Sequence, residues 1–139
     1  MRIREITSLE QIQFIHDRLY EYNLSKTGEK RQEIILKPEP PRAGWYVTDG
    51  DDETIRGGVV WQLHPGNELY VDFLWVDDSL RKQGVGRQLL DLACAGARER
   101  KCTAVTLFTS SFQAPEFYKK YGFSLSKREG ESFFYRLEL

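Results

Sequence analysis

Residues 69–87 read LYVDFLWVDDSLRKQGVGR and hold a strand, a glycine loop and the start of a helix in direct succession. Residues 69–76 are apolar on both faces, which is typical of a strand in the centre of a sheet. From about Gly84 to Arg100, apolar residues recur at helical spacing along one stripe. The pattern therefore predicts a helix that packs on the sheet and begins where the glycine loop ends.

This junction between strand and helix is suited to phosphate groups. The start of a helix exposes up to four unpaired backbone N–H groups and a partial positive charge. Gly84 and Gly86 lack the Cβ atoms that keep a ligand away from the backbone. Arg81, Lys82 and Arg87 add three local cations to a chain with a net charge of -1. A diphosphate fits these groups, although a tight turn followed by a solvated helix start would explain the same residues.

The loop matches neither of two common nucleotide motifs. A Walker loop requires G-x-x-x-x-G-K-[ST], and the dinucleotide fingerprint requires a third Gly or Ala where this chain has Leu89. The phosphate ligand is thus not expected to belong to a P-loop or Rossmann site.

Two linked motifs resemble those of the GNAT superfamily of N-acetyltransferases. Arg81, Gly84 and Gly86 occupy the defining positions of that family's Q/R-x-x-G-x-G/A acyl-CoA loop. The segment from Ala114 to Phe123, APEFYKKYGF, is similar to its A-x-x-F-Y-x-K-x-G-F block. The resemblance covers most of the chain and implies an acetyl-CoA-dependent acyltransferase that acetylates an amine.

The order of predicted elements agrees with that resemblance. Before the central strand, the patterns predict a strand over 2–6, a helix bearing Ile12 to Tyr20, an irregular surface segment over 22–44, and a hairpin of 45–47 and 57–61. After the helix that follows the glycine loop, they predict a strand over 104–108, a helix over 114–121, and strands over 123–126 and 133–137. We expect one domain spanning residues 1–139, of the α/β (α+β) class. The resemblance implies a mixed, mostly antiparallel central sheet of six or seven strands, about four flanking helices, and a splay between strands four and five.

The resemblance also implies the residues that hold acetyl-CoA. The acyl-pantetheine arm would pair with the backbone of Leu74, Trp75 and Val76. Ser111 stands where relatives often have an Asn that bonds the arm, and it reaches less far. The pyrophosphate would be held by the whole loop: Arg81, Lys82, Gln83, Gly84, Val85, Gly86 and Arg87.

Catalytic roles follow from the same resemblance. Tyr118 matches the family tyrosine that protonates the leaving thiolate, and a phenol is protonated at neutral pH as a general acid must be. Tyr70 stands where many relatives have a glutamate base. Asp72, two residues on and flanked by apolar residues, is the outstanding carboxylate of this strand, with Glu68 as the alternative. The sequence leaves the identity of the base open.

Composition excludes several other classes of function. The balance of 20 basic and 21 acidic residues gives no sign of nucleic acid as a partner. Cys94 and Cys102 lack the spacing of a zinc or redox pair, and we expect no metal. No segment has the length of a signal peptide or membrane span, so we expect no membrane association and a cytoplasmic protein.

Three questions stay open at this stage. His16 and His64 show no partner pattern and receive no role. The acceptor amine, a small molecule, an antibiotic or a protein, is not determined, and neither is homodimer formation. The alternative to an enzyme is a catalytically weak acyl-CoA sensor or interaction module, which the missing Glu at position 70 and the Ser at 111 would favour.

Overall fold

The computed structural model describes residues 1–28, 33–110 and 115–139. Within these residues, seven strands form one sheet in the order β1-β2-β3-β4-β5-β7-β6, and β4 and β5 are the only parallel pair among them. The strands are β1 (Arg2–Glu5), β2 (Ala43–Thr48), β3 (Ile55–His64), β4 (Glu68–Val76), β5 (Ala104–Ser110), β6 (Ser124–Glu129) and β7 (Ser132–Glu138). The expectation of a mixed, mostly antiparallel sheet is confirmed.

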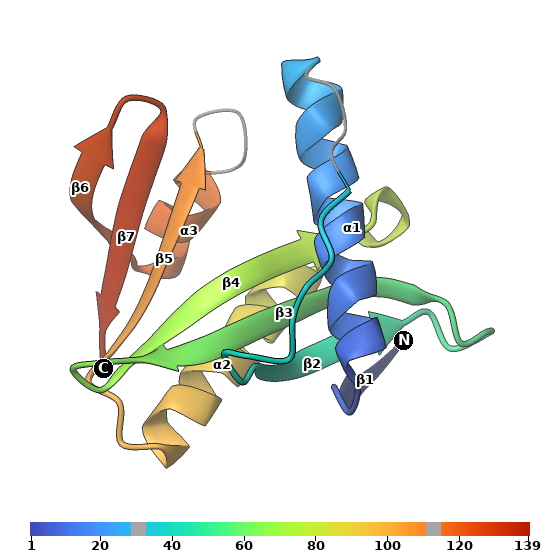
Figure 1. The fold of residues 1–139 in the computed structure, drawn as a ribbon, viewed down its shortest axis with the longest axis horizontal. Coiled ribbons are helices and arrows are strands. Elements are labelled where there is room, and N and C mark those ends of the chain that lie inside the picture. The colour runs from blue at the N-terminus through green and yellow to red at the C-terminus, as the bar shows by residue number, and fades with distance from the viewer. Residues whose placement is uncertain (29–32, 111–114) are drawn as a thin grey trace.

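The helices lie on both faces of this sheet. Helix α1 (Leu9–Thr27) crosses the front face in Figure 1, whereas α2 (Val85–Glu99) lies behind β3 and β4 and α3 (Pro115–Tyr121) lies behind β5. A single 3-10 turn, Asp78–Leu80, connects β4 to the loop before α2. The part of the chain that the structure describes contains three α-helices, one fewer than expected.

The first helix is longer than the sequence pattern indicated. We predicted irregular structure from Tyr22 onward, but α1 continues to Thr27. No Gly or Pro interrupts the chain before Gly28, which adopts φ 71° and donates its N–H to the carbonyl of Leu24 at 2.8 Å. A left-handed glycine is a common helix end. The added turns extend α1 beyond the end of β4 in Figure 1 and carry Tyr22 and Asn23 to the side of the opening between β4 and β5.

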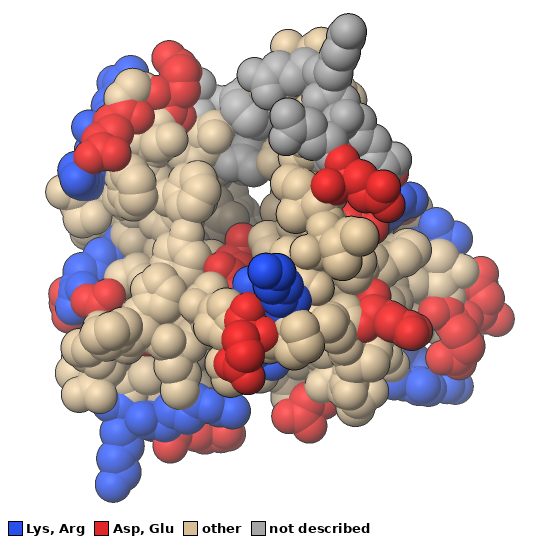
Figure 2. Space-filling model, in the orientation of Figure 1, with Lys and Arg blue, Asp and Glu red and all other residues tan. Residues whose placement is uncertain are grey.

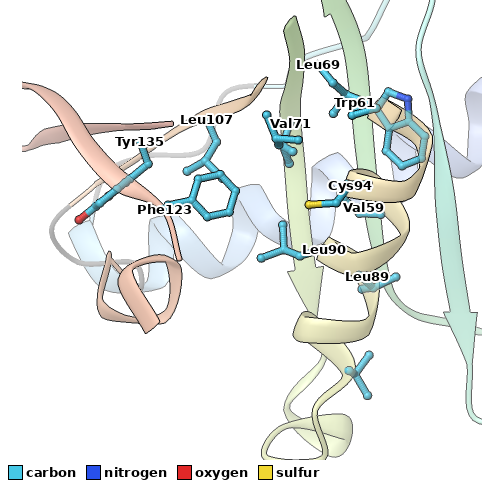
Figure 3. Close-up of a cluster of buried hydrophobic side chains, with 14 of the residues drawn as sticks. Val59, Trp61, Leu69, Val71, Leu89, Leu90, Cys94, Leu107, Phe123 and Tyr135 are labelled. Carbon is cyan, nitrogen blue, oxygen red and sulfur yellow. The ribbon is translucent and has the colours of Figure 1, made fainter. Parts of the chain in front are cut away.

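The main core lies between the sheet and α2. Figure 3 shows Trp61, Leu69 and Val71 of the strands facing Leu90 and Cys94 of the helix. The same cluster extends to the other side of the molecule through Leu107, Phe123 and Tyr135. This continuous packing fixes the start of α2 relative to the end of β4.

The sheet opens between β4 and β5, as the resemblance implied. Pairing of these strands covers only Glu68–Tyr70 with Ala104–Thr106. On its other side β4 pairs with β3 as far as Val76. One edge of β4 therefore has no strand partner among the described residues from Val71 onward.

A β-bulge in β4 lies at the point where the strands separate. Val60 pairs with Phe73 and Trp61 with Val71, so Asp72 is an additional residue in β4. Val71 packs in the core beneath α2, whereas Phe73 packs on the side of α1. The bulge thus turns Phe73 toward α1, although a regular strand would put it on the same face as Val71.

Within the described ranges, no helix is both long and apolar enough to cross a lipid bilayer.

Candidate active site

A cavity of about 670 Å³ occupies the opening between β4 and β5. Its walls come from α1, the free edge of β4, the start of α2, the end of β5 and α3. In Figure 2 the surface is hollowed between the α1 side and the β5–β7 side of the molecule. Elements distant in the sequence therefore share one solvent-connected site.

The first turn of α2 presents free backbone amides to this cavity. Gly84 is the N-cap, with φ 75° and no side-chain capping bond. The first helical hydrogen bond runs from Gln88 N to Gly84 O at 3.0 Å, so the amides of Val85, Gly86 and Arg87 have no partner inside the helix. All these loop residues from Gly84 to Arg87 line the cavity. Main-chain donors arranged in this way at the start of a helix are suited to an anion.

Gly86 also allows close packing beside the site. A Cβ on this residue would lie 3.2 Å from Cζ of Phe117 in α3. The start of α2 is thereby pressed against the helix that carries Tyr118.

The three cations differ in how far they are already engaged. The Arg81 guanidinium lies 4.8 Å from the ring centre of Tyr22 and pairs with Asp78 at 3.0 Å. The Arg87 guanidinium lies 5.5 Å from the Tyr121 ring. Lys82 adopts φ 62° and forms no ion pair within residues 1–28, 33–110 and 115–139. Lys82 is the most available of the three charges.

The free edge of β4 forms the floor of the cavity. Leu74, Trp75 and Val76, the residues predicted to lie beside an extended ligand arm, all line the cavity. The backbone groups on this edge have no strand partner in the described part of the chain, so an extended ligand can hydrogen-bond to them like an additional strand. Binding of this kind depends little on the identity of the side chains.

Tyr118 lies in the wall formed by α3. Its ring contacts Phe117, Phe123 and Tyr135 at centre distances of 5.3, 5.8 and 6.2 Å. Burial raises the pKa of Tyr118 above its ordinary value. The phenol therefore stays protonated at neutral pH and is able to donate a proton.

Asp72 lines the cavity but is already well bonded. Gln62 Nε2 donates to both carboxylate oxygens at 2.9 and 2.8 Å, and Arg42 Nε donates to Oδ2 at 3.1 Å. The side chains of Arg42 and Asp72 are only 12% and 11% exposed. Arg42 also donates to the carbonyl of Lys37 at 3.3 Å, so this cluster ties the segment before β2 to the bulge.

We predict that Arg42→Met lowers the free energy of unfolding by about 3 kcal/mol, because it leaves the Asp72 charge buried without its partner. Urea denaturation followed by circular dichroism measures this change. Arg4→Met is the control, because its ion pair with Glu53 spans 3.5 Å at the surface, and we expect it to cost less than about 1 kcal/mol. Equal effects of the two changes would contradict a structural role for the buried pair.

Two of the predicted site residues, Tyr70 and Gln83, are not brought to the cavity. Tyr70 is stacked on His64 with ring centres 4.6 Å apart and does not line it. Burial, with the nearby Asp72 charge, raises the pKa of Tyr70 to about 12. Gln83 bonds to the Ser79 carbonyl at 3.3 Å and also lies outside the lining. Ser111 falls outside the described residues.

Glu68, the alternative carboxylate, is bound by Arg136 of β7 across the sheet. It lies at the closed end of the β4–β5 seam and does not line the cavity.

The sequence reasoning missed His16 and Tyr22, which both line the cavity from α1. His16 is 8% exposed, on the stripe that also buries Ile12 and Ile15. Its spacing of four residues from Ile12 was a signal of that buried face. Tyr22 could not be placed because its helix was predicted to end earlier.

No group of three or more His, Cys, Asp or Glu side chains within the described ranges is arranged to hold a metal ion.

The chain is similar to known acetyltransferases in sequence and in fold. A family model described as the acetyltransferase (GNAT) family matches residues 4–123. An acetyltransferase of Agrobacterium fabrum is 30% identical over 122 residues, which are 88% of this chain and 82% of that protein. Blasticidin-S acetyltransferase of Streptomyces morookaense is 39% identical over 101 residues, 69% of this chain and 71% of its own length.

Solved structures give the same picture. The crystal structure of an acetyltransferase from Bacillus cereus matches with a TM-score of 0.64 and 33% identity, covering 100% of this chain and 98% of that one. An N-acetyltransferase from Thermoplasma acidophilum, solved in complex with coenzyme A, matches with a TM-score of 0.72 over the whole of both chains, at 16% identity. The latter likeness concerns the fold alone.

Proposed function

This chain belongs to the acetyltransferase (GNAT) family and is an acyltransferase, and we propose that it transfers an acetyl group from acetyl-CoA to a primary amine by direct attack. One observation carries the proposal: uncapped amides at the start of α2 and the protonated phenol of Tyr118 line the same cavity. Acetyl-CoA supplies the thioester. The chain supplies binding, orientation and proton transfer.

The residues present fit this donor. The amides of Val85, Gly86 and Arg87, with Lys82 and Arg81, would hold the pyrophosphate. The unpaired edge of β4 at Leu74, Trp75 and Val76 would bind the extended arm through its main chain.

Tyr118 would act as the general acid that gives its proton to the departing sulfur. Because its pKa is raised, the partly buried phenol keeps this proton at neutral pH until the sulfur departs. Backbone N–H groups on the free edge of β4 would stabilise the oxygen on which charge develops.

Asp72 would orient the acceptor amine from its position on β4. Its carboxylate is held in place by Gln62 and Arg42. Tyr70 lies beside Asp72 and outside the cavity, and we propose that it supports the position of Asp72.

A thiol-release assay with acetyl-CoA tests the proposal. The acceptor panel contains blasticidin S, because of the related acetyltransferase, together with polyamines, amino acids, aminoglycosides and lysine peptides. We expect amine-dependent release of thiol, matched by mass spectrometry with one acetyl group on the product. Tight binding of coenzyme A without release for any amine would instead favour a sensor.

A further inference from the structure

His16 lies at the point where the sheet opens. Its imidazole packs edge-to-face on Phe73 with ring centres 5.1 Å apart, and it stacks on Tyr20 at 5.8 Å. Phe73 directly follows the bulge at Asp72 and is the first of the four β4 residues, through Val76, that line the cavity beyond it. An acceptor amine that approaches the arm along β4 would therefore meet this ring.

The hydrogen bonding of His16 fixes its tautomer. Nδ1 lies 3.1 Å from Oδ1 of Asp17. An ionised carboxylate only accepts hydrogen bonds, so the ring proton resides on Nδ1 and the lone pair of the neutral imidazole on Nε2. Nε2 forms no hydrogen bond with the part of the chain that the structure describes. A cavity-lining base thus has an open acceptor position.

Asp17 is itself held by a second residue. Gln13 Nε2 donates to Oδ1 of Asp17 at 2.9 Å and to the carbonyl of Ile34 at 2.8 Å, while its Oε1 accepts from Leu36 N at 2.7 Å. The segment before β2 therefore anchors Gln13, Gln13 anchors Asp17, and Asp17 orients the imidazole. A carboxylate that orients a histidine in this way is a recurrent arrangement for proton transfer.

We propose that His16 is the general base that takes the proton from the acceptor ammonium group, and that Asp17 and Gln13 are positioning residues. The inference deepens the proposed function and rests on it. One proton passes from the ammonium nitrogen to Nε2 of His16 and then to solvent. The neutral nitrogen forms the C–N bond as the C–S bond breaks. Tyr118 protonates the sulfur and recovers a proton from the new amide nitrogen, so the step balances.

Asp72 is less suited to this role. Its two oxygens already accept three hydrogen bonds, one of them from the Arg42 guanidinium. The titratable groups that share the cavity with His16 are Tyr20 and Tyr22 on α1, Asp72 on β4, Arg81, Lys82 and Arg87 at the start of α2, and Tyr118 on α3. Among these the imidazole has both a free lone pair and a partner that orients it.

The test compares His16→Gln and His16→Phe with the wild-type chain and with His64→Gln. His64 is a matched control, since it stacks on Tyr70 and does not line the cavity. At pH 7 we expect His16→Gln to lower kcat/KM for the amine about 100- to 1,000-fold, the usual contribution of a general base. The dissociation constant for coenzyme A should stay within twofold, and His64→Gln should behave as wild type.

The pH profile separates proton transfer from packing. A primary amine loses its proton near pH ~10 without help, so the rate of His16→Gln should rise about tenfold per pH unit toward that value. His16→Phe keeps a ring against Phe73 and should show the same loss and the same recovery. Asp17→Asn should lower kcat about tenfold with KM unchanged.

Two results would overturn the inference. One is activity of both His16 variants within threefold of wild type at pH 7. The other is a loss that stays constant at all pH values, which would mean that the ring only packs. If the wild-type chain itself acetylates no amine, the proposed function fails, and the role of His16 as a base fails with it. That outcome differs from an active wild type with equally active His16 variants, which would contradict the role of His16 alone.

Discussion

Tyr118→Phe is expected to lower kcat about 100- to 1,000-fold while the dissociation constant for coenzyme A stays unchanged. The substitution removes only the hydroxyl, so the ring still packs on Phe117, Phe123 and Tyr135. Loss of a general acid costs about 10²- to 10⁴-fold in rate. Steady-state thiol release with a saturating amine, combined with calorimetric titration of coenzyme A, measures both quantities.

Tyr121→Phe is the matched control on the same helix. Its hydroxyl donates to Asp91 at 2.6 Å, away from the cavity lining. Its loss should cost about 1 kcal/mol of stability with no change in kcat. If the Tyr118→Phe variant kept nearly the full kcat, that result would contradict the role of Tyr118 as the general acid.

The pH dependence of the reaction follows from the same burial. Because the pKa of Tyr118 is raised, its proton is lost only above pH ~10, the ordinary value of a phenol. The acid form is thus present at every lower pH, and ionisation of Tyr118 should cause no decline in rate below pH ~10.

The second large effect is expected at the glycine loop. Gly84→Val should weaken binding of coenzyme A about 30-fold or more. Gly84 has φ 75°, where a β-branched residue is strained by about 1–3 kcal/mol, and relief of that strain displaces the amides of Val85 and Gly86. Titration calorimetry of coenzyme A measures the change.

Gly130→Val is the control for strain alone. Gly130 lies in the β6–β7 turn with φ 56°, and an added Cβ meets nothing within 4 Å at either glycine. Both variants should lose similar thermal stability, but only Gly84→Val should lose affinity. Equal affinities would mean that the loop does not hold the donor.

The junction of strand, loop and helix was predictable from sequence because its signals are local. An apolar run, two glycines, three cations and a helical stripe follow one another between Leu69 and Arg100. The order of strands came from the same local patterns together with the family resemblance. These signals require no knowledge of contacts between distant segments.

The environment of the predicted carboxylate was not predictable. Asp72 is bonded to Arg42, 30 positions away, through a segment that the sequence showed only as irregular. The alternation of faces along a strand predicted Tyr70 and Asp72 on one face, and the bond from Gln62, which pairs with Tyr70, agrees. Alternation alone could not predict the bulge, which brings Phe73 to the same face as Tyr70 and Asp72.

His16 was given no role at the level of sequence for a similar reason. Its partner Asp17 is the next residue in the chain, and neighbours on a helix do not ordinarily face each other. The proposed role of this pair depends on the cavity that His16 lines. That cavity exists because β4 and β5 separate, which is a contact pattern between distant segments.

The short seam between β4 and β5 has a further consequence for the free protein. From Val71 to Val76 this edge of β4 has no strand partner among the described residues, and an unpaired strand edge is a place where another strand can add. Proteins usually protect unpaired strand edges from such pairing with charged residues or prolines. Residues 71–76 contain one charged residue, Asp72, and no proline. A donor bound along this edge would also cover the open strand, and we therefore expect the chain to self-associate more readily without its donor than with it.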